Sequence, residues 1–90
     1  MKIILSPAAE KDRLYWKQSG DKKSMAKIQK LVAELEQHPT TGTGQVEQLK
    51  GDWSGFWSRR INKKDRIIYK IDLEKGEVHI TSMRDHYGEK

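Results

Sequence analysis

The amino-acid sequence predicts an α+β fold, in which a two-helix hairpin packs on one face of a small, mainly antiparallel and twisted β-sheet. Two segments in the first half of the chain carry helix signals, and the second half alternates apolar and polar residues as strands do. One short apolar run precedes the helices, so the expected element order is β-α-α-β-β-β. The length of 90 residues suits a single domain.

The first strand and the first helix are expected to meet at Ser6. Residues 3–5 are Ile-Ile-Leu, a short β-prone run. Serine caps helices, and Pro7 fits the first helical position because its missing N–H would have no partner there. We therefore expect a strand at 3–5 and a helix over 7–18, which the Ser-Gly-Asp sequence at 19–21 ends.

The second helix has the clearest pattern. Its apolar residues trace one stripe at helical spacing: Met25, Ile28, Leu31, Val32 and Leu35. The helix should end at His38, because a residue that precedes proline is pushed out of the α region. The next segment, 40–45, contains Thr-Gly-Thr-Gly. It does not lie between a strand and a helix, as a nucleotide-binding loop requires, so we expect a connector.

Three strands are expected in the second half of the chain, over residues 56–62, 66–72 and 77–84. Ile67, Tyr69 and Ile71 recur at every second position, as in a strand with one buried face. Turns are predicted at 63–65 and at 73–76. The two helices would then cover one face of an antiparallel sheet.

The charge of the chain limits its partners. Lysine and arginine number 18 against 13 acidic residues, which gives a formal net charge of +5. This excess favours nucleic acid as the first candidate partner and an acidic protein as the second. The charge could also serve solubility alone, but nucleic acid is favoured over that because the basic residues cluster with aromatic ones. The absence of cysteine excludes disulfides and cysteine metal sites. No pair of histidines has the helical spacing of a metal site, so we predict no metal and no cofactor. The N-terminal apolar run is too short for a signal peptide or a membrane span, and we expect a cytoplasmic protein.

Three polar residues match the needs of metal-free RNA cleavage: Glu47, Arg66 and His86. Such cleavage requires a base for the ribose 2′-OH, a cation for the charge on the phosphate and an acid for the departing 5′-oxygen. Nineteen positions separate Glu47 from Arg66 and twenty separate Arg66 from His86, so only the fold can bring them together. Each residue taken alone is more often an ordinary surface charge.

Arg59 and Arg60 are consecutive on an expected strand, so their side chains should point to opposite faces. At most one of them faces a given site, and the other should pack its stem on an aromatic ring or lie in solvent. If the turn holds an odd number of residues, Arg60 lies opposite Arg66. Two cations on one face are costly unless an anion binds there, so this register predicts a phosphate pocket.

Trp53, Phe56 and Trp57 lie close together in the sequence. Core packing is expected for at least one tryptophan, while another could stack on a base. Tyr87 has the same two interpretations, because it could anchor the C-terminus or stack on a substrate base. His79 is expected to be structural.

Four segments together resemble the Txe/YoeB family of toxins, which belongs to the RelE/ParE superfamily. They are residues 44–50, the Ser-Gly-Phe-Trp-Ser-Arg-Arg-Ile run at 54–61, residues 65–69 and the final His86-Tyr87 pair. The similarity extends from Met1 to Tyr87. It therefore implies one RelE/YoeB-like toxin domain over residues 1–87, followed by a short C-terminal tail over 88–90.

The resemblance implies a RelE-like fold and a toxin of a type II toxin–antitoxin system that cleaves mRNA in the ribosomal A site and so inhibits translation. By motif position, Glu47 resembles the general base, His86 the general acid and Arg66 the phosphate-stabilising cation. Arg60 resembles a second phosphate contact, and Tyr87 a supporting substrate-binding residue. The implied partners are a YefM/Phd-type antitoxin, the ribosome with its mRNA, and a second toxin copy in a homodimer.

Two features depart from the family pattern. Lys63-Lys64 occupies a turn in which the family usually carries acidic residues, and residues 88–90 follow the His-Tyr pair. Two other functions are weighed against cleavage. One is a protein that blocks translation by occupying the ribosome without catalysis. The other is a DNA gyrase poison, a superfamily branch that lacks this Glu, Arg and His-Tyr set.

Overall fold

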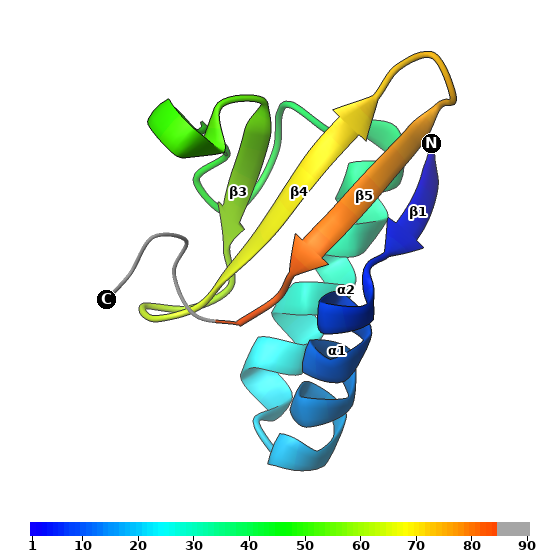
Figure 1. Cartoon of the computed structure of the whole chain (residues 1–90). Coiled ribbons are helices and arrows are strands. Elements are labelled where there is room, and N and C mark those ends of the chain that lie inside the picture. Colours follow the sequence, from blue (N-terminus) through cyan, green and yellow to red (C-terminus); the bar gives the residue numbers. More distant parts are fainter. Residues whose placement is uncertain (85–90) are drawn as a thin grey trace.

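A computed structural model describes residues 1–84 of the chain. This part contains two α-helices and a five-stranded sheet (Figure 1). In chain order the elements are β1 (Lys2–Leu5), α1 (Pro7–Ser19), α2 (Lys22–Gln37), β2 (Glu47–Gln48), the 3-10 helix η1 (Gly51–Trp53), β3 (Phe56–Arg60), β4 (Arg66–Asp72) and β5 (Glu77–Ser82).

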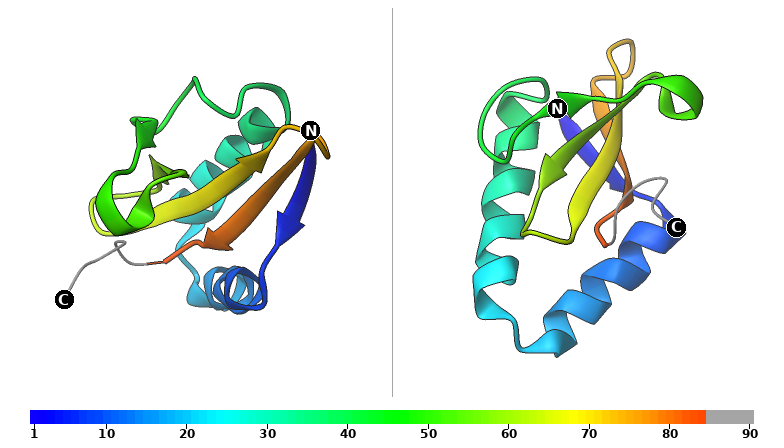
Figure 2. Two further views of the ribbon diagram at one scale, coloured as in Figure 1. Left: turned by 45° about the horizontal axis from the view of Figure 1, so that its top comes forward. Right: turned by 90° about the vertical axis from the view of Figure 1, so that its left-hand side faces the viewer.

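The sheet is mixed, with the strand order β1-β5-β4-β3-β2. The first strand runs parallel to β5, and all other neighbouring strands are antiparallel. Both helices pack on the same face of the sheet, where their buried residues meet those of β4 and β5 (Figures 1 and 2). The α+β class and the two helices on one face are therefore confirmed.

The bounds of the elements follow the sequence expectations closely, and β4 covers residues 66–72 as predicted. Strand β3 ends at Arg60, two residues earlier than expected. The cause is Asn62, whose Oδ1 accepts the backbone N–H groups of Lys64 (2.8 Å) and Asp65 (2.7 Å) and so closes a turn. Strand β5 ends at Ser82, two residues before the expected end at 84.

The start of α1 forms as the sequence predicts. The Ser6 hydroxyl accepts a hydrogen bond from the Ala9 N–H (3.0 Å) and donates one to the Thr81 carbonyl (2.8 Å), so the cap also ties the helix to β5. Gly20 ends α1 in the left-handed conformation (φ 77°) that glycine adopts without strain. The chain then reverses direction, and the two helices diverge along their length (Figure 2). Neither of these helices is both long and apolar enough to cross a membrane.

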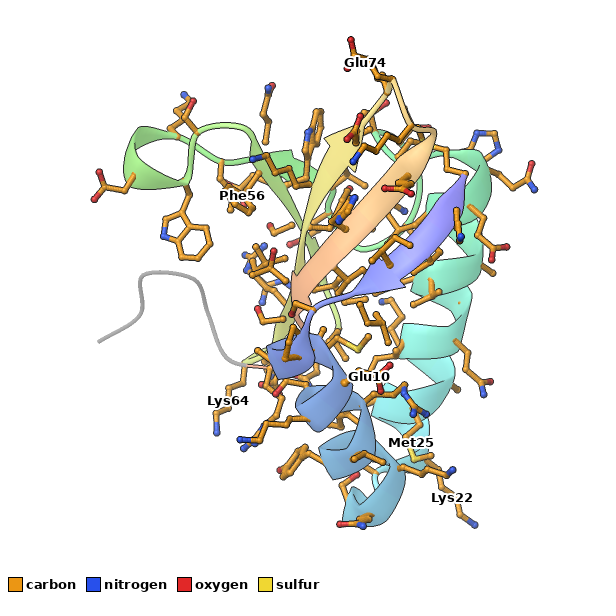
Figure 3. The ribbon with its side chains drawn as sticks, turned by 45° about the vertical axis from the view of Figure 1, so that its right-hand side comes forward. Glu10, Lys22, Met25, Phe56, Lys64 and Glu74 are labelled. Carbon is orange, nitrogen blue, oxygen red and sulfur yellow. The ribbon has the colours of Figure 1, made fainter. Side chains whose placement is uncertain are left out.

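The core lies between the helices and the sheet. Its fully buried residues come from both layers: Ala9, Leu31, Leu35, Ile67, Tyr69, Val78 and Ile80. Trp16 is also buried, and its indole N–H donates to the Met83 carbonyl (2.8 Å). Phe56, by contrast, lies on the other side of the sheet (Figure 3). The functional side chains described next belong to that second, helix-free face.

Candidate active site

Polar residues of three strands share the helix-free face of the sheet. Glu47 pairs with Ser58 across β2 and β3, and Arg60 pairs with Arg66 across β3 and β4. Because side chains alternate along a strand, these four residues point to the same side. The structure therefore brings together Glu47 and Arg66, which the sequence places far apart.

Arg66 is the centre of this group. Its Nη1 donates to the Ser58 hydroxyl (3.1 Å) and lies 3.5 Å from Oε1 of Glu47. The Arg66 side chain is only 12% exposed, whereas that of Glu47 is 52% exposed. The sheet thus holds the cation firmly, and the carboxylate stands at the solvent edge.

Arg60 lies opposite Arg66, as an odd-numbered turn requires. Its Nε donates to the side-chain oxygen of Gln45 (2.9 Å), and its Nη1 donates to the Lys63 carbonyl (3.2 Å). Two guanidinium groups therefore occupy one face of the β3–β4 hairpin. Like charges directly opposite each other destabilise a sheet, so the pair favours a bound anion.

Arg59 points to the other face and is fully buried. Of the two expected positions, solvent is wrong, and the aromatic ring is supported because the guanidinium carbon lies 5.9 Å from the centroid of the Tyr69 ring. Nη1 of Arg59 forms an ion pair with Glu34 (2.9 Å), and its Nε donates to the Tyr69 hydroxyl (3.2 Å). The guanidinium also donates to three loop carbonyls: those of His38, Thr41 and Thr43. Neither this role for Arg59 nor that of Glu34 was predicted.

The loop held by Arg59 leads directly to β2. Within it, the Gly44 carbonyl accepts the backbone N–H of Arg60 (2.6 Å). Gly44 has a φ of +93°, and a Cβ there would lie 3.0 Å from Leu31 and 3.1 Å from the Arg60 carbonyl. Both the positive φ and the close contacts therefore require glycine at position 44. This Thr-Gly-Thr-Gly segment is a connector, as expected, and it positions Gln45 and Glu47.

The same network shifts two pKa values. The backbone N–H and the hydroxyl of Thr43 donate to the Glu34 carboxylate (both 2.8 Å), and these bonds lower the pKa of Glu34, with a further contribution from Arg59. Burial raises the pKa of Tyr69, although Arg59 opposes that shift. The Tyr69 hydroxyl in turn donates to the Pro39 carbonyl (2.6 Å). The ion pair and the loop are thus one connected structure.

Of the remaining candidates, His86 and Tyr87 are outside the described residues. His79 lies near the β4–β5 turn, where its Nε2 is 2.8 Å from Glu77. Donor atoms of Asp72, Glu77 and His79 all lie within 4.8 Å of one another, so these residues could hold a metal ion. They occupy the end of β4 opposite to Arg66 and are separate from the candidate active site.

The aromatic residues divide between the two faces. Trp57 packs against the core, as expected for at least one tryptophan. Trp53 makes an edge-to-face contact with Phe56 (centroids 5.2 Å apart) outside that core. Lys70 lies over the Phe56 ring at 5.3 Å. Aromatic surface therefore continues along the helix-free face beyond the two arginines.

This arrangement can bind a phosphate beside a proton acceptor. Within the described residues, Nε and Nη2 of Arg66 donate no hydrogen bond, which leaves them for an anion. Guanidinium groups match phosphate geometry, and the adjacent Glu47 carboxylate can take a proton. These are two of the three functions that cleavage of a phosphodiester by a neighbouring hydroxyl requires.

Comparison with known proteins identifies the family of the chain. Residues 5–87 match the sequence profile of the YoeB-like toxins of bacterial type II toxin–antitoxin systems. Toxin YoeB of Escherichia coli K12 is 39% identical, over 97% of this chain and all of that one. A YoeB–YefM heterotetramer and a YoeB dimer, both from Staphylococcus aureus, are each 35% identical, with TM-scores of 0.81 and 0.82. Each covers 97% of this chain and 98% of the other.

Proposed function

Because the chain belongs to the YoeB-like toxins of bacterial type II toxin–antitoxin systems, we propose that it is a metal-independent endoribonuclease that cleaves mRNA in the ribosomal A site. The observation that carries this proposal is the contact between Glu47 and Arg66 on the helix-free face, with Arg60 beside them. A carboxylate and two guanidinium groups have no need of a metal to bind and activate a ribose–phosphate unit.

In this mechanism Glu47 accepts the proton of the ribose 2′-OH. The 2′-oxygen attacks the adjacent phosphorus, and the bond from phosphorus to the 5′-oxygen breaks. Arg66 and Arg60 stabilise the charge that develops on the phosphate oxygens. We assign the proton donor for the departing 5′-oxygen to His86, and a supporting contact with the substrate to Tyr87. The products are a 2′,3′-cyclic phosphate and a 5′-hydroxyl.

The decisive experiment is cleavage of a translated mRNA by purified protein in the presence of ribosomes. Glu47→Gln and His86→Ala should each reduce the rate by roughly 10²-fold or more, as expected for loss of a general base or acid. Glu10→Gln is the matched control, because Glu10 is an exposed glutamate in a surface ion pair on α1. Activity should persist in EDTA. Normal cleavage by His86→Ala or Glu47→Gln would rule out the assigned roles.

The same assay distinguishes cleavage from simple obstruction. A non-catalytic inhibitor would arrest translation while the mRNA stays intact. It would also be insensitive to Glu47→Gln, since its binding depends on the positive charge and not on a proton acceptor. The contact between a carboxylate and Arg66 favours cleavage over this alternative.

The partners follow from the same family membership. We infer that a YefM-type antitoxin binds and inhibits this chain in the cytoplasm, and that two copies associate as in the S. aureus YoeB dimer. Co-purification with the product of an adjacent reading frame tests the first inference. Light scattering of the free toxin and of that complex tests the second.

A further inference from the structure

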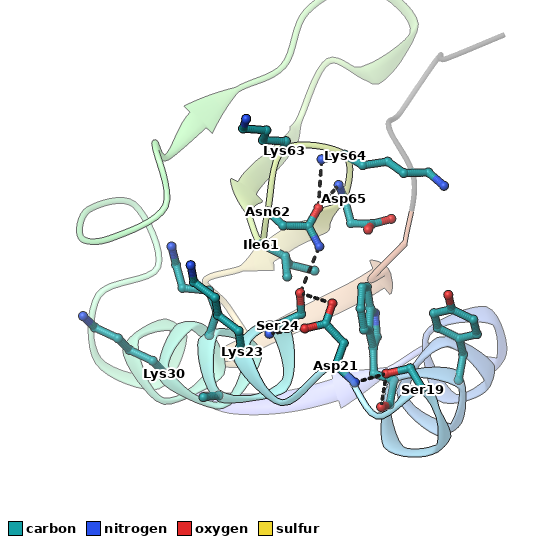
Figure 4. A pocket seen from close by; sticks show the side chains of 14 residues that line it. Ser19, Asp21, Lys23, Ser24, Lys30, Ile61, Asn62, Lys63, Lys64 and Asp65 are labelled. Carbon is teal, nitrogen blue, oxygen red and sulfur yellow. Dashed lines mark hydrogen bonds between the residues drawn. The ribbon is translucent and has the colours of Figure 1, made fainter.

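A groove lined by lysines shares the β3–β4 turn with the candidate active site. It has a volume of about 940 Å³ and lies between the first half of α2, the end of α1 and the β3–β4 turn (Figure 4). Five lysines from two separate segments line it: Lys23, Lys27, Lys30, Lys63 and Lys64. In the close view, the labelled lysines project from the helix and from the turn toward solvent.

The charge in this groove is strongly unbalanced. Five lysines face two aspartates, Asp21 and Asp65, which leaves three of the chain's five excess positive charges at one place. Asp21 is already engaged, because its carboxylate caps α2 by accepting from the Ser24 N–H (3.0 Å) and hydroxyl (2.8 Å). Asp65 is buried. Across the described residues, none of the five lysines forms an ion pair.

The two lysine-bearing segments are locked together. The side-chain amide of Asn62 donates to the Ser24 hydroxyl (3.0 Å), while its oxygen accepts the turn N–H groups of Lys64 and Asp65. This series of hydrogen bonds joins the β3–β4 turn to the first helical turn of α2 (Figure 4). The fold therefore fixes the backbones that carry the lysines, in spite of their mutual repulsion. A binding surface for an anion accounts for that arrangement.

The groove lies on the helix side of the sheet and shares the β3–β4 turn with the catalytic face. The Lys63 carbonyl accepts a hydrogen bond from Arg60, and Asp65 directly precedes Arg66. We propose that the groove binds the phosphodiester backbone of RNA next to the phosphate that Arg60 and Arg66 hold. Lysine acts there as a point charge on phosphate and gives affinity without base preference. The choice of RNA over an acidic protein rests on this shared turn, and hence on the proposed function.

The test compares two triple variants of equal net charge. Lys23→Gln/Lys27→Gln/Lys30→Gln removes the helix side of the groove. Lys2→Gln/Lys11→Gln/Lys75→Gln removes three lysines that do not line it. The probe is a short fluorescent 2′-O-methyl RNA, which binds but lacks the attacking hydroxyl. Affinity is measured by anisotropy from about 50 to 200 mM salt.

The groove variant should bind the probe at least tenfold more weakly than wild type, with the slope of log K against log salt smaller by about 2. The control variant should change affinity much less. Equal losses in the two variants would overturn the proposal, because only net charge would then matter. Unchanged RNA affinity with weakened antitoxin binding would also overturn it, in favour of an acidic protein partner. If the helix variant folds poorly, the double variant Lys63→Gln/Lys64→Gln is measured in the same assay, because it removes the lysines on the turn side of the groove.

Cleavage is measured separately, so that this proposal and the proposed function can fail independently. Glu47→Gln should lose cleavage and keep groove-dependent binding. At saturating protein concentration, the groove variant should cleave the mRNA at a rate close to that of wild type. A wild-type protein that binds through the groove but never cleaves would refute the nuclease and leave the RNA-binding surface intact.

Discussion

Replacement of Arg59 by lysine should destabilise the whole domain, although Arg59 touches none of the residues assigned to catalysis. Its guanidinium donates hydrogen bonds to five acceptors among the described residues, and its side chain is fully buried. A lysine keeps the charge but presents its donors from a single nitrogen. It cannot reach acceptors spread from the Tyr69 hydroxyl to the Thr41 carbonyl at the same time.

The loss can be counted in hydrogen bonds. About two or three of the five should be lost, each worth roughly 1 kcal/mol net. Water can partly replace the hydrogen bond to the Thr41 carbonyl, because Thr41 is an exposed residue. Arg59→Lys should therefore cost about 2 kcal/mol, which lowers the Tm of a domain of this size by roughly 8–16 °C. Arg59→Met leaves all five acceptors without this donor, and it should cost about 3–5 kcal/mol.

The measurement is thermal and urea unfolding, combined with amide hydrogen exchange in the loop. The Thr43 N–H, which donates to Glu34, should lose protection in Arg59→Lys. Arg60→Lys is the control, since the Arg60 side chain forms only exposed hydrogen bonds among the described residues, on the other face. This change should affect cleavage far more than stability. An Arg59→Met protein as stable as wild type would refute the argument that this arginine anchors the loop.

Three further changes test separate parts of the fold. Ser6→Ala removes the cap of α1 and should lower the free energy of unfolding by about 1 kcal/mol, measured in urea. Trp16→Phe leaves the Met83 carbonyl without its indole donor and should cost about 1–3 kcal/mol in the same assay. Hydrogen bonds from Thr43 lower the folded pKa of Glu34 below its ordinary 4.5, so its contribution to stability is complete above that value and is lost as pH falls through the folded pKa. Unfolding of Glu34→Gln between about pH 3 and 7 should depend less on pH than that of wild type.

Much of the fold could be predicted from the sequence, because periodicity and capping are local signals. The apolar stripe of α2 and the alternation in β4 predicted the positions of these two elements to within a few residues. Strand β2 was not predictable, since its two residues are too few to show a period. Its pairing with β3 nevertheless decides whether Glu47 meets Arg66. Long-range pairing of this kind leaves no local trace, so the residue types alone suggested Glu47 and Arg66, and the roles expected of them by position came from the resemblance to a known family.

Arg59 is fully buried and Arg60 is not, and this difference follows from the neighbours of Arg59. Trp57 and Ile61 both pack into the core, and alternation along the strand forces Arg59 onto their side. The apolar residues thus set which face is buried, and a charged residue is buried with them. Such a charge is tolerated only with a partner, which explains why Glu34 and the loop carbonyls converge on it. If this account is right, Arg59→Met combined with Glu34→Gln should lose less stability than the sum of the two single changes. Additive losses would mean that the ion pair is incidental and that the carbonyls alone hold the loop.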